Sequence, residues 1–317
     1  MKLVDEYLEQ VPNSALYHYT NACGLIGILK SKSIWASSIH HLNDTQEYKH
    51  AVGMMSEELE KRFRKIESSS GLEQLYGTTQ TPSSHSIDSL SLLRENLEGL
   101  KETPLYIASF SEHKDVLSQW RGYCKEGDGY SIGFMPQTLT CLQSGGFQLV
   151  KCVYSQEDQR VLCNALIDSY LQLDAKFVGK RTLWRHGSKS EWRSKFSVLA
   201  AAIKHLGFEE EAEWRLIGKE DDENAPHFRS GRSGVVPYLV VPIVTGDENV
   251  PVAELVIGPT DDKEASLIGA QKIMERYARK NLANRLFPSR SPEEPLRIAS
   301  PGLVDYLITP SATPYRN

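Results

Sequence analysis

Leu16-Tyr17-His18-Tyr19-Thr20 and, far downstream, Glu211-Ala212-Glu213-Trp214-Arg215-Leu216 are the two stretches that decide the fold of this chain. Both have the pattern of a strand with one polar face, because alternate residues of a strand point to the same side. His18 and Thr20 would share one face of the first strand and the two tyrosines the other. In the second stretch, the two glutamates would share one face and Trp214 and Leu216 the other.

Periodicity along the rest of the chain predicts a mixture of strands and helices. Expected strands lie near residues 17–20, 34–37, 105–110, 130–134, 147–154, 214–217, 235–241 and 254–257. Expected helices lie near residues 22–30, from 46 onward, and at 115–123, 158–173, 191–206 and 264–279. Asn21 or Thr20 is placed to cap the first helix. The helix that begins near Gln46 should bury a stripe of Tyr48, Val52, Met55, Leu59 and Phe63.

The order of these elements lacks regular βαβ alternation and shows no repeat, which favours one α+β domain over residues 1–317, with a mixed sheet core decorated by helices. A Ser-, Gly-, Thr- and Gln-rich stretch at about 67–86 is expected to be a mobile insertion. A Pro-rich tail at about 287–317 closes the chain.

Composition narrows the classes of protein. The chain has 317 residues, 40% of them hydrophobic, and a formal charge of -5, so no global field draws it onto nucleic acid. The start lacks the apolar segment of a secretory signal, and no apolar run is long enough to span a membrane. Five cysteines without a C-x-x-C pair argue against a disulfide framework or a zinc site. We therefore expect a cytoplasmic protein that holds no metal and contacts no membrane.

Common nucleotide and hydrolase motifs are absent from the sequence. There is no G-x-G-x-x-G turn, no Walker A loop, no H-E-x-x-H and no G-x-S-x-G elbow. The chemistry must therefore come from other residues.

The two opening stretches offer such residues. A neutral imidazole at His18 suits a ribose hydroxyl, although a buried histidine bonded to a backbone carbonyl explains the same residue. Two carboxylates on one face, Glu211 and Glu213, would repel, which tends to raise one pKa. A carboxylate also stabilises the oxocarbenium-like charge that develops when a glycosidic bond breaks. A solvated acidic turn is the alternative, and it fits Glu209 and Glu210 better than Glu213.

Two further clusters of polar residues have structural and functional interpretations. Asn43, Asp44 and Glu47 fit a helix cap better than a catalytic group. Around Ser111, an acid, an arginine and aromatic residues are concentrated within a short stretch. Arg121 could clamp a pyrophosphate and Trp120 or Tyr123 could stack on a ring. A structural contact between Asp115 and Arg121 would explain the same residues without a ligand.

Basic residues gather in the stretch Lys176–Lys195, where Trp184 and Trp192 lie among seven lysines and arginines. This pattern could contact nucleic acid by charge and stacking. A solvated helix face whose tryptophans point inward is the alternative that we prefer.

Taken together, the motifs resemble a bacterial family known as domain of unknown function 2971. The match runs in order along most of the chain, at Leu16 to Thr20, Trp35 to Ser37, Leu42 to Glu47, Phe110 to Tyr123, Gly129 to Phe134, Glu211 to Arg215, Phe228-Arg229, Pro237-Tyr238 and Ile257 to Pro259. That family is similar in turn to ADP-ribosyltransferases, especially those that modify nucleic acid, and so implies a split sheet core and NAD as co-substrate.

The resemblance implies a role for each site residue. His18 would hold the adenosine-side ribose with the help of Thr20, and Tyr19 would be a further cofactor-binding residue. Glu213 would bind the nicotinamide ribose and stabilise the cation, and Glu211 would orient the acceptor or act as its base. The remaining candidates are Tyr123 or Tyr130 for stacking on nicotinamide, Arg121 for the pyrophosphate, and Arg215 and Arg229 as supporting residues.

Three functions follow as hypotheses. The first is an NAD-consuming transferase that places ADP-ribose on nucleic acid or protein, as a toxin or antiphage defence effector. The second is a metal-dependent nuclease that uses Asp44 or Asp115 with Glu211 or Glu213. The third is a non-catalytic nucleotide-binding or regulatory module.

Overall fold

The computed structural model describes residues 2–41, 45–76, 84–100, 103–123, 127–176, 181–222, 224–231, 234–244, 248–278 and 307–313. Contacts divide the chain into two compact units, each built from three stretches that alternate along the sequence. The helical unit comprises residues 1–10, 38–105 and 150–208, and the sheet unit comprises residues 11–37, 106–149 and 209–317. A single domain over residues 1–317 stays a prediction.

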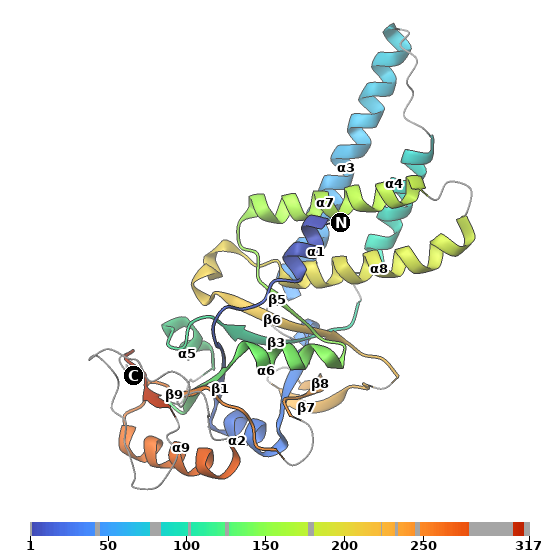
Figure 1. Ribbon diagram of the computed structural model, residues 1–317. Coiled ribbons are helices and arrows are strands. Elements are labelled where there is room, and N and C mark those ends of the chain that lie inside the picture. Colours follow the sequence, from blue (N-terminus) through green and yellow to red (C-terminus); the bar gives the residue numbers. More distant parts are fainter. Residues whose placement is uncertain are drawn as a thin grey trace. The chain divides into compact units, whose positions relative to one another are not determined.

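The helical unit is built mainly from helices (Figure 1). Its elements are α1 (Lys2–Leu8), the short η1 (Ile39–His41), α3 (Thr45–Tyr76), α4 (Ser84–Glu98), α7 (Gln156–Lys176) and α8 (Arg181–Ala202). The expected stripe on α3 is confirmed, because Tyr48, Val52, Met55 and Leu59 are buried and Phe63 is half-buried. The Tyr48 hydroxyl donates to the carbonyl oxygen of Leu100 at 2.9 Å, so its polar end is satisfied inside the core.

Two sequence predictions in this unit are wrong. Residues 67–76 continue α3 as helix and residues 84–86 begin α4, where a mobile insertion or loop was expected, while residues 77–83 of that stretch lie outside the described residues. Ser and Gln tolerate a helix interior once the rest of the helix is packed, so composition alone misjudged this stretch. The helix expected at 191–206 begins earlier, at Arg181, and ends at Ala202.

The sheet unit has a mixed ten-stranded sheet, which confirms the α+β class. Its strands are β1 (Leu16–Asn21), β2 (Ser33–Ser38), β3 (Leu105–Ser111), β4 (Gly129–Phe134), β5 (Gln148–Lys151), β6 (Glu213–Lys219), β7 (His227–Gly231), β8 (Gly234–Pro242), β9 (Glu254–Ile257) and β10 (Ile308–Pro310). The main order is β10-β9-β4-β1-β3-β2-β8-β7, while β6 pairs with β3 and β5. Its helical elements are α2 (Ala22–Ser31), α5 (Leu117–Tyr123), α6 (Pro136–Leu142), η2 (Gln143–Gly145), η3 (Leu206–Glu211, across the unit boundary) and α9 (Lys263–Tyr277).

Strand β1 pairs over very different lengths with its two neighbours, β4 and β3. Strand β1 pairs with β4 along its whole length, from Leu16 opposite Phe134 to Asn21 opposite Gly129. With β3 the register joins Tyr17 to Ser111 alone in the described strands. The ladder between β1 and β3 does not extend beyond this pair in the described strands. Figure 1 shows β1, β3 and β6 following one another in the sheet.

The core of the sheet unit is one apolar cluster between the sheet and its helices. Trp214, Leu216, Phe110 and Phe134 are all at most 2% exposed. Strand β6 therefore turns Trp214 and Leu216 inward, as alternation predicted. Helix α2 is capped by Asn21, whose side chain accepts from the Gly24 amide, and this confirms the predicted cap.

The C-terminal tail also differs from expectation. Residues 308–310, expected to lie in a Pro-rich tail, form β10 in parallel register with β9. Burial of Thr309 and Ser311 beside β9 holds this strand in the sheet unit. The rest of the tail, at 287–306 and 314–317, lies outside the described residues.

Candidate functional site

His18 lies on β1, and its ring meets β3. Nδ1 lies 2.9 Å from the carbonyl oxygen of Ser109, and the ring packs 5.6 Å from the ring of Phe110. Burial lowers the pKa of His18, although the Ser109 carbonyl partly opposes the shift. Because a carbonyl only accepts, the neutral ring carries its proton on Nδ1 and presents Nε2 as an acceptor. His18 can therefore form the structural bond to a backbone carbonyl and still bind a ligand through Nε2.

Glu211 and Glu213 do not share a strand face, which corrects the prediction. Glu211 ends η3, Ala212 has φ of 40°, and β6 begins only at Glu213. The left-handed residue breaks the alternation on which the prediction relied. Ala212 is held there by two bonds, from its amide to the Glu209 carbonyl at 3.0 Å and to its carbonyl from the Glu112 amide at 3.1 Å.

The end of β3 joins both opening stretches of the sequence. Ser111 is 2% exposed, lies opposite Tyr17 of β1, and donates through Oγ to the carbonyl oxygen of Glu211 at 2.7 Å. The next residue, Glu112, accepts from the indole Nε1 of Trp214 at 2.9 Å. We call the group His18, Ser109, Ser111, Glu211 and Glu213 the β3 junction.

Glu213 is buried and forms an ion pair inside the sheet unit. Its Oε2 lies 3.1 Å from Nη2 of Arg215, and the two residues are 4% and 1% exposed. The pair lies on the face of β6 opposite Trp214 and Leu216. A buried carboxylate needs a partner of opposite charge, so Arg215 offsets the cost of burying Glu213 at the start of β6. It fills a structural role at the same time.

Tyr19 and Trp120 are buried residues of the sheet unit, and their predicted contact with a ligand stays a prediction. Tyr19 is 3% exposed, and its hydroxyl donates to the His113 carbonyl at 2.8 Å and accepts from the Val116 amide at 3.1 Å. Trp120 is also 3% exposed and packs edge-on against Tyr19 at 4.7 Å. These contacts leave almost no surface of either ring for stacking.

Asp115 does not bond Arg121, so that predicted structural contact is wrong. Its carboxylate accepts from Nε1 of Trp120 at 2.6 Å and from three groups of the C-terminal segment. These are the Ser311 hydroxyl at 2.5 Å, the Ala312 amide at 2.7 Å and the Thr313 hydroxyl at 3.0 Å. Burial raises the pKa of Asp115, but these bonds outweigh it and leave the pKa below its usual value. A carboxylate with four donors is poorly placed as a metal ligand.

Arg121 and Tyr123 are on the surface of α5, as a ligand-binding role requires. Both are exposed, Tyr123 to 49%. No carboxylate pairs with Arg121 in the part of the chain that the structure describes. Their position relative to the β3 junction does not decide whether these two residues would contact NAD or the acceptor.

Thr20 and Tyr130 are neighbours across β1 and β4, where they form a register pair. Both are half-buried, and burial beside Asp128 raises the pKa of Tyr130. Thr20 packs closely against the first turn of α2: a Cβ placed on Gly24 would lie 1.9 Å from Thr20 Oγ1. Glycine is therefore needed where α2 leaves the strand.

One buried carboxylate escaped the sequence prediction. Glu254 of β9 is 5% exposed and accepts from Tyr17 at 2.9 Å, Lys114 at 2.8 Å and Thr309 at 2.9 Å. Burial and the Glu254 charge raise the pKa of Tyr17. In the sequence, Glu254 stands out only as an acidic residue at the start of an apolar strand. The three donors come from three distant parts of the chain, so the residue ties the tail to β1.

Other predicted residues are placed as follows. Asn43 and Asp44 lie outside the described residues, while Glu47 is half-buried near the start of α3. Arg229 of β7 donates through Nη2 to the Ser37 hydroxyl at 3.0 Å. Among the described residues, no three His, Cys, Asp or Glu side chains gather as metal ligands. No described helix is long and apolar enough to cross a membrane.

The basic stretch Lys176–Lys195 is described only in part. Trp192 is 2% exposed and stacks on Phe196 at 5.5 Å, so it points inward as the packing interpretation predicts. Lys195 pairs with Asp5 at 2.8 Å and Glu191 at 2.7 Å, which reduces its value for binding phosphate. Residues 177–180 and the side chains of 173–189 lie outside the description.

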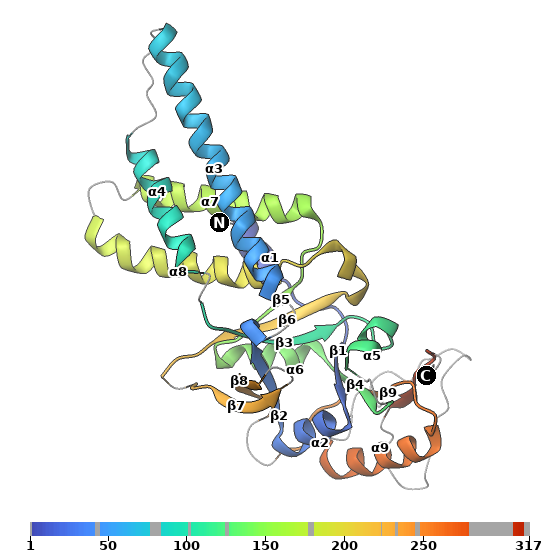
Figure 2. The ribbon, with the colours of Figure 1, turned by 180° about the vertical axis from the view of Figure 1, so that it is seen from behind.

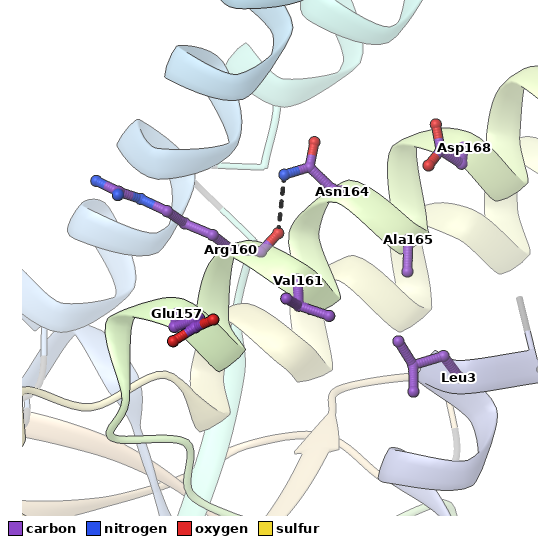
Figure 3. Close-up of a pocket in the computed structure, with 7 residues that line it drawn as sticks. All are labelled: Leu3, Glu157, Arg160, Val161, Asn164, Ala165 and Asp168. Atoms are coloured by element: carbon purple, nitrogen blue, oxygen red, sulfur yellow. Dashed lines mark hydrogen bonds between the residues drawn. The ribbon is translucent and has the colours of Figure 1, made fainter.

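The helical unit carries an open hollow of 490 Å³ that sequence reasoning missed. Figure 3 shows its lining side chains on α1 and α7: Leu3, Glu157, Arg160, Val161, Asn164, Ala165 and Asp168. Asp168 is already paired with Arg62 at 2.5 Å. None of the predicted site residues lines this hollow.

Comparison with known proteins agrees in part with the resemblance. The model of a family described as a protein of unknown function (DUF2971) matches residues 119–216. This span contains α5 from its third residue onward, all of β4 and the Glu213–Arg215 pair, while His18 lies before it. The comparisons with curated proteins and with solved structures gave no match.

Proposed function

We propose that this chain is an NAD-consuming ADP-ribosyltransferase that modifies nucleic acid or protein, acting as a bacterial toxin or antiphage defence effector. The observation that carries the proposal is the β3 junction. His18 bonds the carbonyl of Ser109, and Ser111 holds the carbonyl of Glu211. The stretches around His18 and around Glu211, which are far apart in the sequence, thereby both bond to the end of β3.

His18 fits the ribose-binding role that the resemblance gives it. The bond to Ser109 leaves Nε2 as an acceptor, and no described residue bonds that atom. The lowered pKa keeps the ring neutral near pH 7. A neutral ring accepts a hydrogen bond from a sugar hydroxyl without adding positive charge. Arg121 and Tyr123, both exposed on α5, are suited to a pyrophosphate and an aromatic ring.

Glu213 would supply the negative charge against which the glycosidic bond breaks. When nicotinamide leaves, positive charge develops on the ribose, and a fixed carboxylate stabilises it more than it stabilises the bound ground state. Arg215 holds that carboxylate in place. Glu211, half-buried at the end of η3, would accept the proton of the attacking acceptor group.

The test is nicotinamide release from labelled NAD by the purified chain, with and without bacterial lysate as a source of acceptors. We expect Glu213→Gln to abolish release. Because Glu213→Gln also removes the charge from the ion pair with Arg215, the variant Glu213→Asp is included, which keeps the charge and moves it by one methylene. We expect Glu213→Asp to remain folded and to lose at least about 100-fold in rate.

The matched control is Glu220→Gln, which alters a carboxylate just beyond the same strand. Glu220 accepts from the Tyr106 hydroxyl at 2.7 Å and lies outside the β3 junction. We expect it to keep the wild-type rate. Release that is unaffected by Glu213→Asp, or that stops on addition of EDTA, would contradict the proposed role of Glu213.

A further inference from the structure

Three motifs that are far apart in the sequence gather on one face of the sheet unit. Trp35 and Ser37 lie on β2, Tyr238 on β8, and His227 and Arg229 on β7. These strands are neighbours in the sheet (Figure 2). The register places Ser37 opposite Tyr238, and Tyr238 opposite His227. We call these five residues the aromatic face.

The rings of this face form a continuous row across three strands. Trp35 stacks on Tyr238 at 4.3 Å with 28° between the rings, and His227 lies 5.7 Å from Tyr238 on the other side. Tyr238 is 9% exposed, but Trp35 is 45% exposed and His227 is exposed as well. A tryptophan with almost half its surface in water gains little by burial, so packing alone does not explain it.

A cation lies beside this row. The guanidinium of Arg229 donates to the Ser37 hydroxyl through Nη2, at 3.0 Å. No carboxylate among the described residues pairs with Arg229, so its remaining donors are available to an anion. The Ser37 bond fixes the orientation of the guanidinium next to the rings, as the recognition of a phosphate requires.

Aromatic rings beside an oriented guanidinium are suited to a ligand that repeats an unpaired base and a phosphate. The bases of a single strand stack on aromatic side chains, whereas those of a duplex are already stacked on one another. Neighbouring strands of a sheet lie about 4.8 Å apart, so Trp35 on β2 and His227 on β7, with β8 between them, are about two such spacings apart, and an extended single strand can reach both. Among the described residues no carboxylate pairs with Arg229, which favours an anionic ligand over a neutral sugar.

We propose that the aromatic face binds single-stranded nucleic acid, with bases stacked on Trp35 and His227 and a phosphate on Arg229. This surface is independent of the NAD chemistry proposed above and would bind the strand in the absence of NAD. Were both proposals correct, the strand would be the acceptor class of the transferase.

The experiment measures fluorescence anisotropy of a labelled single-stranded oligonucleotide of about 12 nucleotides, titrated with the whole chain in the absence of NAD. We expect saturable binding that Trp35→Ala weakens about tenfold, since one lost base stack corresponds to such a factor. Arg229→Ala should weaken binding to a similar degree and make it less dependent on salt, because one phosphate contact is lost. Arg229→Lys should restore part of the salt dependence.

Phe228→Ala is the matched control. Phe228 is 64% exposed and lies between His227 and Arg229 on β7, but alternation places it on the opposite face. We expect wild-type affinity from this variant. Circular dichroism of each variant confirms that the fold is kept.

Several results would overturn the proposal. They are an absence of binding by the wild type, equal losses in Trp35→Ala and Phe228→Ala, and equally strong competition by duplex or by free mononucleotide. A negative result in this binding experiment does not affect the nicotinamide-release test, because that test measures the effect of Glu213 variants and uses no oligonucleotide.

Discussion

The hydroxyl of Ser111 donates to the carbonyl oxygen of Glu211 at 2.7 Å, although the two residues are 100 positions apart. This bond fixes the turn from which β6 starts. Ala212, the next residue, has φ of 40°, and Glu213 follows as the first residue of the strand. The position of the buried Glu213 carboxylate therefore depends on β3 as well as on its own strand.

Ala212→Gly should raise the free energy of unfolding by up to about 1 kcal/mol, because glycine adopts a positive φ without steric penalty. The matched control is Ala165→Gly in the helix α7, which should lower it by about 1 kcal/mol. Urea unfolding measures both. Equal losses in the two variants would show that the left-handed backbone at Ala212 is not strained.

Glu213→Gln should lower the free energy of unfolding by about 3–5 kcal/mol, because it removes the charged carboxylate from a buried ion pair with Arg215. Adding Arg215→Met should recover part of this loss, since the double variant no longer buries a charge at this position. A double-mutant cycle by urea unfolding gives the coupling. Additive losses would mean that the two side chains do not stabilise each other.

Gly24→Ala should destabilise the chain by about 1–3 kcal/mol, because its Cβ would lie 1.9 Å from Thr20 Oγ1. Thr20→Ala in the same chain should relieve the clash and restore most of the stability. Gly27→Ala, in the same helix with open space around it, should instead gain about 0.5–1 kcal/mol. Thermal unfolding of the three variants checks the order, and a loss at both glycines would point to a different cause.

His18 should make the chain less stable in acid. The pKa of His18 in the folded chain lies below the ordinary value of 6.5. Between these two pKa values, the unfolded chain therefore binds more protons at this residue than the folded chain does. The free energy of unfolding therefore falls within this window, and the penalty is absent above it. His18→Gln should flatten this part of the profile, measured by urea unfolding at about pH 5, 6 and 7. An unchanged slope would mean that His18 titrates alike in both states.

Asp115→Ala should free the C-terminal segment and lower the free energy of unfolding by about 2–3 kcal/mol, because the Trp120 indole loses a charged partner. Faster amide exchange at residues 309–313 should accompany the loss. Asp222→Ala, at an exposed position, serves as the control and should change stability by less than about 0.5 kcal/mol. Unchanged exchange in Asp115→Ala would show that other contacts hold the segment.

Local features of the sequence were enough to predict most of the elements and the α+β class. Asn21 was expected to cap α2, and its side chain accepts from Gly24. His18 and the neighbouring tyrosines were expected on opposite faces of β1, and Tyr19 packs on Trp120 while His18 meets β3. Caps and alternation depend on residues within one turn or one strand, so local sequence suffices.

Features that depend on distant neighbours were not predictable in this way. Asp115 could pair with Arg121 by spacing, yet its donors are Trp120 and residues 311–313. Residues 308–310 of the tail form β10 beside β9, which the Pro-rich composition did not indicate. Each of these depends on which strand or helix lies alongside, and short-range spacing carries no such information.

The sequence by itself determined where strands and helices form, how α2 is capped and which faces of β1 and β6 are apolar, because these follow from residues close together in the chain. Only the tertiary structure decided that Glu211 and Glu213 are separated by a left-handed Ala212. It also decided that Trp35, Tyr238 and Arg229 share one face. The physical reason is that strand register and hydrogen bonds between distant segments are set only when the whole sheet pairs.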